Sequence, residues 1–173
     1  MCGRFALDAH TDELIQEYAA AGGDFRDWRP SYSIAPTNPV PIVRERVDAD
    51  SGELRRTLDV TRWDFRPSFV DEKGKPNFNA RIERLTTGGL WRAAFAGTRA
   101  LVPMRGYFEW TGPIGDKQPH FLHDDAGKAH MLDLLTDESE RRAGTIATHE
   151  VDRKVNYTRG VDPADASLIV STS

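Results

Sequence analysis

Residues 40–63 read VPIVRERVDADSGELRRTLDVTRW. The runs 40–47 and 54–63 are rich in β-branched and apolar residues, and the polar stretch 48–52 between them is prone to turns. Two β-rich runs joined by a short polar turn are typical of a β-hairpin. We therefore expect this hairpin to be a main element of a sheet-rich fold.

Before the hairpin, the sequence predicts a helix over about residues 11–20. Thr11, which is followed by two acidic residues, is the expected N-cap, and Leu14, Ile15 and Tyr18 then fall on one face. After the hairpin, residues 85–96 are helix-like despite two adjacent glycines. Short strands are expected at residues 101–103, 106–110, 119–123, 131–135 and 167–171, with a turn at 124–127. Many strands and few helices predict an α+β fold: a single domain of mainly antiparallel, barrel-like sheet with a few packed helices.

Composition bounds the class of protein. The chain has 173 residues, of which 39% are hydrophobic and 29% charged, as in one ordinary soluble domain. One cysteine excludes a disulfide scaffold and a thiolate metal cluster, and we expect no metal or other cofactor. The sequence has neither a run of about 20 apolar residues nor a secretory leader, so we expect a cytoplasmic protein.

Charge is unevenly distributed along the chain. The formal net charge is −4, yet residues 62–110 carry nine basic groups against five acidic ones. The chain has 18 arginines and 5 lysines, and a guanidinium suits bidentate binding of phosphate. For any single arginine, a solvated surface position is the commoner explanation.

Cys2 offers unusual chemistry. Removal of Met1 would leave a free α-amine beside the thiol, and both groups are partly in their nucleophilic forms at neutral pH. The amine condenses with an aldehyde to give an imine, and the thiol then adds to the imine carbon to close a thiazolidine ring. By position alone, however, a cysteine at residue 2 is more often incidental.

Five separated segments give Cys2 a context. They read MCGRF (residues 1–5), RPSYSIAPT (29–37), WDFRPSF (63–69), NARIE (79–83) and LVPMRGYFEW (101–110). In this order they resemble the SOS-response-associated peptidase family, abasic-site processing proteins that shield damaged single-stranded DNA by covalent attachment. The match runs clearly from Met1 to about His123.

The resemblance implies a catalytic set. Cys2 would become the N-terminal residue and form a thiazolidine with the ring-opened sugar of an abasic site. Asn79 and Glu109 match the family's active-site asparagine and glutamate. Ring opening and imine formation both need proton transfer, for which a carboxyl group among aromatics is suited, and strand alternation sets Glu109 on one face with Tyr107. The alternatives are an ion-paired strand glutamate and a turn or capping asparagine.

The resemblance also implies a partner, single-stranded DNA containing abasic sites, in a cytoplasmic, nucleoid-associated protein. Arg4 and Arg81 match residues that hold DNA phosphates. Trp63 lies in the segment that packs near the DNA, although a lone tryptophan is more often part of a core.

One family motif is missing. The family carries a histidine motif after an apolar strand, and residues 167–172 look like that strand, so we expect a single domain over residues 1–173 that stops just before the motif. Crosslink formation needs mainly Cys2, so we expect it more firmly than crosslink reversal, which depends on the family's histidine. The chain's possible substitutes, none in a matching motif, are His120, His123, His130 and His149.

Three functions remain open from the sequence. The first is an abasic-site sensor that crosslinks to DNA through Cys2. It would remove its own Met1 by a self-processing peptidase activity. Lyase-type reversal of the crosslink is in doubt without the family's histidine. The second is an N-terminal-nucleophile hydrolase, in which the thiol attacks an amide and the α-amine serves as base. The third is a module that binds single-stranded DNA through arginines and aromatic stacking without chemistry.

Overall fold

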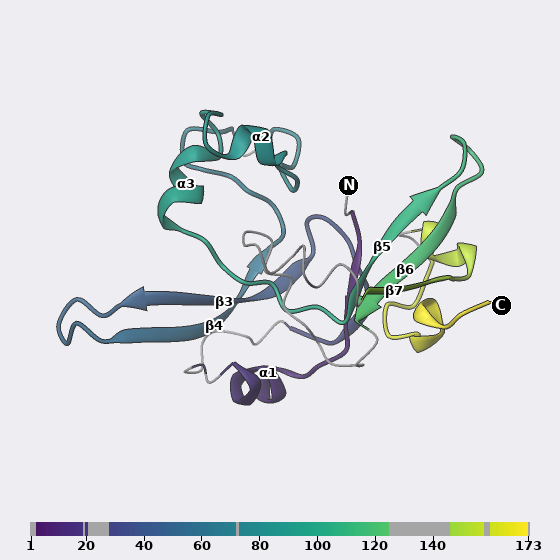
Figure 1. Cartoon of the computed structure of the whole chain (residues 1–173), viewed down its shortest axis with the longest axis horizontal. Coiled ribbons are helices and arrows are strands. Elements are labelled where there is room, and N and C mark those ends of the chain that lie inside the picture. Colours follow the sequence, from purple (N-terminus) through teal and green to yellow (C-terminus); the bar gives the residue numbers. More distant parts are fainter. Residues whose placement is uncertain are drawn as a thin grey trace.

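A computed structural model describes residues 3–18, 20, 28–71, 73–124, 146–157 and 160–172. Its main element is a five-stranded antiparallel sheet with the strand order β2-β1-β5-β6-β7 (Figure 1). The strands are β1 (Phe5–Leu7), β2 (Ser31–Ile34), β5 (Gly106–Thr111), β6 (Gln118–Asp124) and β7 (Ile146–Glu150). The first strand of the chain is thus an inner strand of the sheet, paired with a segment about 100 residues later in the sequence.

The expected hairpin is confirmed. Strands β3 (Pro39–Val47) and β4 (Leu54–Arg62) pair in register from Pro39 opposite Arg62 to Val47 opposite Leu54. The Asp48 carboxylate closes the turn by accepting hydrogen bonds from the backbone N–H groups of Asp50 and Ser51. In Figure 1 the far half of this two-stranded ribbon projects from the body of the molecule, with α1 (Thr11–Glu17) on one side of it.

Two apolar clusters hold the molecule together, one on each side of β1 and β5. The first joins β1 and α1 to the ribbon through Phe5, Leu14, Val43 and Leu58 among others. The second contains Phe108 with the following residues: Ala6, Phe121, Val151, Val155 and Leu168. Because neighbouring residues of a strand point to opposite faces, β1 and β5 each contribute to both clusters.

The helices differ from expectation in extent. Thr11, the N-cap expected from the sequence, is instead the first residue of α1; the N-cap is His10, whose N–H donates to the Glu13 carboxylate over 2.8 Å. The helix ends at Glu17. The expected helix over residues 85–96 forms only in part: two short helices, α2 (Ile82–Leu85) and α3 (Arg92–Gly97), flank an irregular stretch. Shortly after α2, the Gly88 N–H donates to the Arg84 carbonyl over 2.9 Å, and a Cβ at residue 88 would lie 2.8 Å from that oxygen.

Two expected strands are also corrected. Residues 101–103 contribute only an isolated bridge between Leu101 and Val43. Residues 167–171 form no strand but a 3-10 helix, η3 (Ala166–Ile169), followed by a bridge of Ser171 to Val151. Asp165 caps η3 by accepting from the Ser167 N–H, and such local side-chain bonds compete with strand pairing.

The fold class is confirmed as α+β, with a mostly antiparallel sheet that does not close into a barrel. The expected strand at residues 131–135 lies outside the described residues, as does most of the expected turn at 124–127. Within the described part, no helix has the length and apolar character of a membrane span.

Candidate nucleic-acid interface

The start of β1 lies beside the strand that carries Glu109. Phe5 is opposite Tyr107, and the Arg4 carbonyl accepts a hydrogen bond of 2.9 Å from the Phe108 N–H. Continued by two residues, this antiparallel register sets Gly3 opposite Glu109. The half-buried Glu109 therefore lies on the β5 face shared with Tyr107 and Phe5, next to the beginning of the chain. The predicted alternation is confirmed, since Tyr107 packs on the first cluster and Phe108 in the second.

A row of aromatic rings extends from Phe5 on that same face. The Trp63 ring contacts the Phe5 ring edge-on at 5.2 Å between centroids, and Phe78 contacts Trp63 at 6.2 Å. The indole N–H of Trp63 also donates to the Phe78 carbonyl over 3.4 Å. This row joins β1 to the segment that carries Asn79, the residue after Phe78.

A carboxylate holds the Asn79 segment in place. The Asp64 side chain is 1% exposed, and it accepts from the backbone N–H of Asn77 over 2.8 Å and from the Arg66 guanidinium. Arg66 also donates to the carbonyls of Asp71 and Gly74, at 3.0 and 2.8 Å. The Arg66 hydrogen bond, assisted by the Asn77 N–H and opposed by burial, lowers the pKa of the Asp64 carboxyl.

Backbone strain occurs next to Trp63. Thr37 adopts a φ of 74°, which is rare for a β-branched residue, and its N–H donates to the Trp63 carbonyl over 2.9 Å. Trp63 in turn donates to the Asn38 carbonyl over 2.9 Å, so residues 37–38 bracket Trp63 where β4 ends. Strain of this kind persists only where the surrounding contacts enforce it.

Arg4 faces away from this group. Its neighbour Phe5 lies on the Tyr107 side, so the Arg4 side chain lies on the opposite face of β1. The side chain is buried, and its guanidinium donates to the carbonyl of Val155 and to the Ser33 hydroxyl. Burial lowers the pKa of this guanidinium. These contacts link Arg4 to residues near the end of the described chain, and its expected role on a DNA phosphate stays a prediction.

The basic excess of residues 62–110 concentrates on one lobe. Asn79 and Arg81 are exposed there, and Arg81 is the N-cap of α2. The exposed cations between residues 73 and 99 are Lys73, Lys75, Arg81, Arg84, Arg92 and Arg99, against one acid, Glu83. In Figure 1 this α2–α3 lobe stands beside the starting end of β1, on the side of the ribbon away from α1. The lobe is therefore a surface suited to a polyanion.

Cys2 and His130 lie outside the described residues. Of the other histidines, His120 lies opposite Glu109 on the same face, and its ring bonds to the Thr111 hydroxyl at 2.8 Å. His123 and His149 pack with Phe121 on the other face. The described residues contain no group of three potential metal ligands.

Two features were not identified from the sequence. They are Phe78 and the hydrogen bonds of Asp64 to Asn77 and Arg66, which we call the Asp64 clamp. Phe78 directly precedes Asn79, so the position was visible, but its contact with Trp63 spans 15 residues of an irregular loop. For Asp64 the signal was its place between Trp63 and Arg66 in an otherwise apolar segment, which favours a partner for the carboxylate.

The fold and this surface define a single-domain α+β protein with a basic lobe beside its N-terminal strand. The family model for the SOS response associated peptidase (SRAP) family matches residues 1–158, and the chain belongs to this family.

Relatives of the chain are named abasic site processing proteins. The chain is 30% identical over 172 residues to "Abasic site processing protein HMCES" of Xenopus tropicalis, covering 85% of this chain and 51% of that protein. It is 27% identical over 132 residues to "Abasic site processing protein YedK" of Escherichia coli, covering 74% and 56%. The chain thus spans about half the length of these relatives.

A solved structure confirms the fold. A crystal structure of a protein from Bacteroides thetaiotaomicron superimposes with a TM-score of 0.72 over 99% of this chain and 100% of that one, at 14% sequence identity. At this identity the likeness concerns the fold alone.

Proposed function

We propose that this chain senses abasic sites in single-stranded DNA and attaches to them covalently through Cys2 after removal of Met1. The observation that carries the proposal is the pairing of β1, which begins at Phe5, with β5, the strand that carries Glu109. The Trp63–Phe78 contact brings the Asn79 segment to the same face, and the names of the relatives point to the same substrate.

The proposed reaction has two bond-forming steps. The α-amine of Cys2 adds to the aldehyde of the ring-opened sugar and releases water, giving an imine. The Cys2 thiol then adds to the imine carbon, and its proton passes to the nitrogen, which closes the thiazolidine. Glu109 would transfer protons in both steps, and Asn79 would hydrogen-bond the sugar or the amine without changing charge. The DNA backbone would lie on the basic lobe, with Arg81 and Trp63 near it.

The test uses an abasic oligonucleotide and an unmodified one of the same sequence. Cys2→Ala should abolish the adduct that survives denaturation and keep reversible binding, because the amine alone gives only an imine that hydrolyses. Retention of Met1, checked by intact mass, should have the same effect. An undiminished adduct in Cys2→Ala would overturn the thiazolidine.

Other outcomes identify the alternative functions. Reversible binding alone would identify a DNA-binding module, and turnover of an amide substrate would identify an N-terminal-nucleophile hydrolase. Removal of Met1 by purified protein that was produced with Met1 retained would support the self-processing activity.

Glu109→Gln separates catalysis from structure. A proton-transfer role predicts a rate of adduct formation lower by about 10²–10⁴-fold, with little change in DNA affinity. Single-turnover crosslinking across neutral pH should lose one titration step. His120→Gln, on the same face, reports whether this histidine shares the proton transfer. An unchanged Glu109→Gln rate at every pH would remove Glu109 from the mechanism.

A further inference from the structure

The distal half of the β3–β4 ribbon carries two arginines that face each other. Arg46 lies directly opposite Arg55 in the register, and both side chains are exposed. Like charges directly opposite each other on a sheet destabilise the strand pair. Within the described residues neither arginine forms an ion pair.

The neighbouring arginines of the ribbon are compensated. Arg44 donates to Asp59 over 3.0 Å, and Arg56 donates to Glu45 over 2.9 Å. Asp48, the acid nearest to the pair in the turn, is bound mainly by the turn itself: its hydrogen bonds from Ser51 and Asp50 lower the pKa of its carboxyl, and the charge of Arg55 makes the smallest contribution. Among the residues that the structure describes, the pair therefore has no direct ion pair, and Asp48 acts on Arg55 only at longer range.

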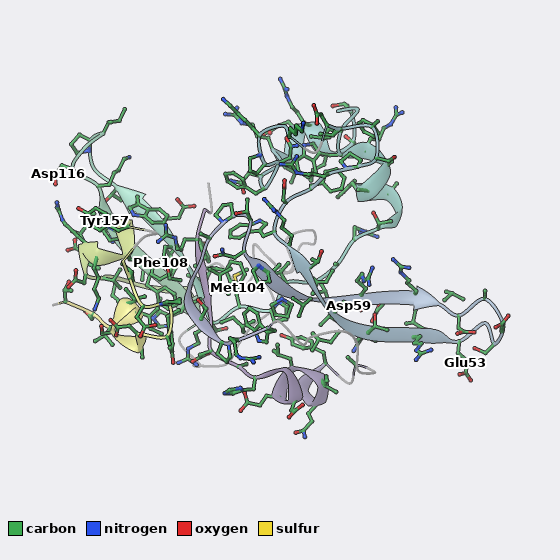
Figure 2. All side chains as sticks on the ribbon, turned by 180° about the vertical axis from the view of Figure 1, so that it is seen from behind. Glu53, Asp59, Met104, Phe108, Asp116 and Tyr157 are labelled. Carbon is green, nitrogen blue, oxygen red and sulfur yellow. The ribbon has the colours of Figure 1, made fainter. Side chains whose placement is uncertain are left out.

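The pair faces the side of the ribbon away from α1. Arg56, one residue from Arg55 and therefore on the other face, donates to the Tyr18 carbonyl beside α1 over 2.7 Å. In Figure 1 the α2–α3 lobe stands on the side of the ribbon opposite α1. Figure 2 shows Glu53 at the far end of the ribbon and Asp59 nearer the body, so the pair lies between an exposed tip and the Trp63 end.

A hollow of about 310 Å³ accompanies the pair. Its lining residues are Arg46, Val47, Asp48, Ala49, Arg55 and Thr57. A guanidinium group can bind the oxygens of a phosphate through two hydrogen bonds, so two arginines that line one hollow are suited to a phosphate group.

We propose that Arg46 and Arg55 form a second contact for the phosphodiester backbone of the nucleic acid whose main contact is the basic lobe and Trp63. This inference rests on the proposed function only in requiring that a nucleic acid binds near Trp63. Eight strand residues separate Arg55 from Trp63, a span of about 26 Å at roughly 3.3 Å per residue. At about 3.4 Å per phosphate of a stacked strand, that span corresponds to about eight phosphates.

The experiment compares unmodified oligonucleotides of about four and about sixteen nucleotides, of which only the longer reaches the pair. Binding is followed by fluorescence anisotropy across a salt series. For the longer strand, Arg46→Gln/Arg55→Gln should lower the salt slope by about 0.7 for each phosphate that the variant no longer neutralises. The slope for the shorter strand should not change.

A matched control removes the same charge elsewhere. Lys117→Gln/Arg153→Gln alters the loop between β5 and β6 and the 3-10 helix η2 (Arg153–Asn156), and should leave both slopes unchanged. The ribbon variant should melt no earlier than the parent at low salt, because a repulsive pair has been removed. An unchanged slope for the longer strand, or an equal decrease in the control, would overturn the second contact.

Two further measurements separate this inference from others. Polyglutamate of matched charge should compete poorly with DNA, and equal competition would make the pair a general anion site and overturn the proposal. Crosslinking of a short abasic oligonucleotide tests Cys2 independently of the ribbon. If the short abasic oligonucleotide forms an adduct but the ribbon variant leaves the salt slope of the longer strand unchanged, only the ribbon contact is refuted. If no adduct forms but the ribbon variant lowers that slope, only the covalent function is refuted.

Discussion

The two sides of the candidate interface, the strands β1 and β5 and the α2–α3 lobe, are stabilised in different ways. β1 and β5 lie between two apolar clusters, and Phe108 is fully buried. The α2–α3 lobe instead has no buried residue in either helix, and its link to the body depends on Trp63 and on the Asp64 carboxylate. The strands β1 and β5, beside Glu109, therefore share the stability of the whole domain, whereas the α2–α3 lobe, beside Asn79, can unfold locally while the rest stays folded.

The largest test of this difference is Phe108→Ala. The Phe108 ring packs on Phe121 at 5.0 Å between centroids, so its removal should lower the free energy of unfolding by about 3–5 kcal/mol. Urea unfolding measures the change, with Ile114→Ala, at a 99% exposed position, as the control. A decrease below about 1 kcal/mol would show that the stability of β1 and β5 does not depend on this cluster.

Arg4→Met tests which role the buried guanidinium has. Removal of its hydrogen bonds leaves the Val155 carbonyl without this donor and should lower the free energy of unfolding by about 1–3 kcal/mol. The competing prediction is a stable variant whose salt slope for DNA falls by about 0.7. Unfolding and binding curves of the same sample distinguish the two, and the second result would assign Arg4 to a phosphate.

Thr37→Gly tests the strain beside Trp63. The left-handed conformation costs a β-branched residue about 1–2 kcal/mol, and glycine relieves it at an entropic cost of about 0.4–1 kcal/mol. We expect a net gain in the free energy of unfolding of roughly 0.5–1 kcal/mol. Thr61→Gly, in the regular strand β4, should instead lower stability. Equal decreases in both variants would argue against strain at Thr37.

The smallest global effect is expected for Asp64→Asn. Because the pKa of Asp64 is lowered in the folded state, its contribution is fully present at neutral pH and disappears as pH falls through that lowered value. Hydrogen-exchange protection of the Phe65 and Asn77 amides should fall in acid for the parent, and should already be low at pH 7 in the variant. Urea unfolding near neutral pH should change little. Equal protection of both proteins at pH 7 would refute the clamp.

Local patterns in the sequence predict the elements that local physics determines. The β3–β4 hairpin and α1 carry turn and capping residues, and both form close to the expected positions. The expected helix over residues 85–96 is interrupted around Gly88, where a Cβ has no room, and the expected strand at 167–171 gives way to a 3-10 helix that Asp165 caps. Periodicity does not register such short-range contacts.

The candidate site is predicted only in part. Motif order points to Trp63, Asn79 and Glu109. In the structure Trp63 packs against Phe5, on the face of β1 and β5 that also carries Glu109, and Phe78, the residue before Asn79, packs against Trp63. The burial of Arg4 against residues 155–157 could not be predicted, because it depends on a contact across about 150 residues of sequence. The contacts of Phe78 and Asp64 could not be predicted for the same reason, although they join residues only 15 and 13 positions apart.

The long-range pairing of β1 has a consequence for biosynthesis. β1 emerges from the ribosome first, whereas its partner β5 is made about 100 residues later and the Val155 carbonyl that Arg4 binds about 150 residues later. At about 5–20 residues per second, these intervals are roughly 5–20 s and 8–30 s. During these intervals the nascent N-terminus has no completed sheet around it and is accessible to a ribosome-bound aminopeptidase. The proposed removal of Met1 would be possible for another enzyme before folding, whereas removal by the folded protein itself would come afterwards. Pulse labelling of the nascent chain would separate the two routes in time.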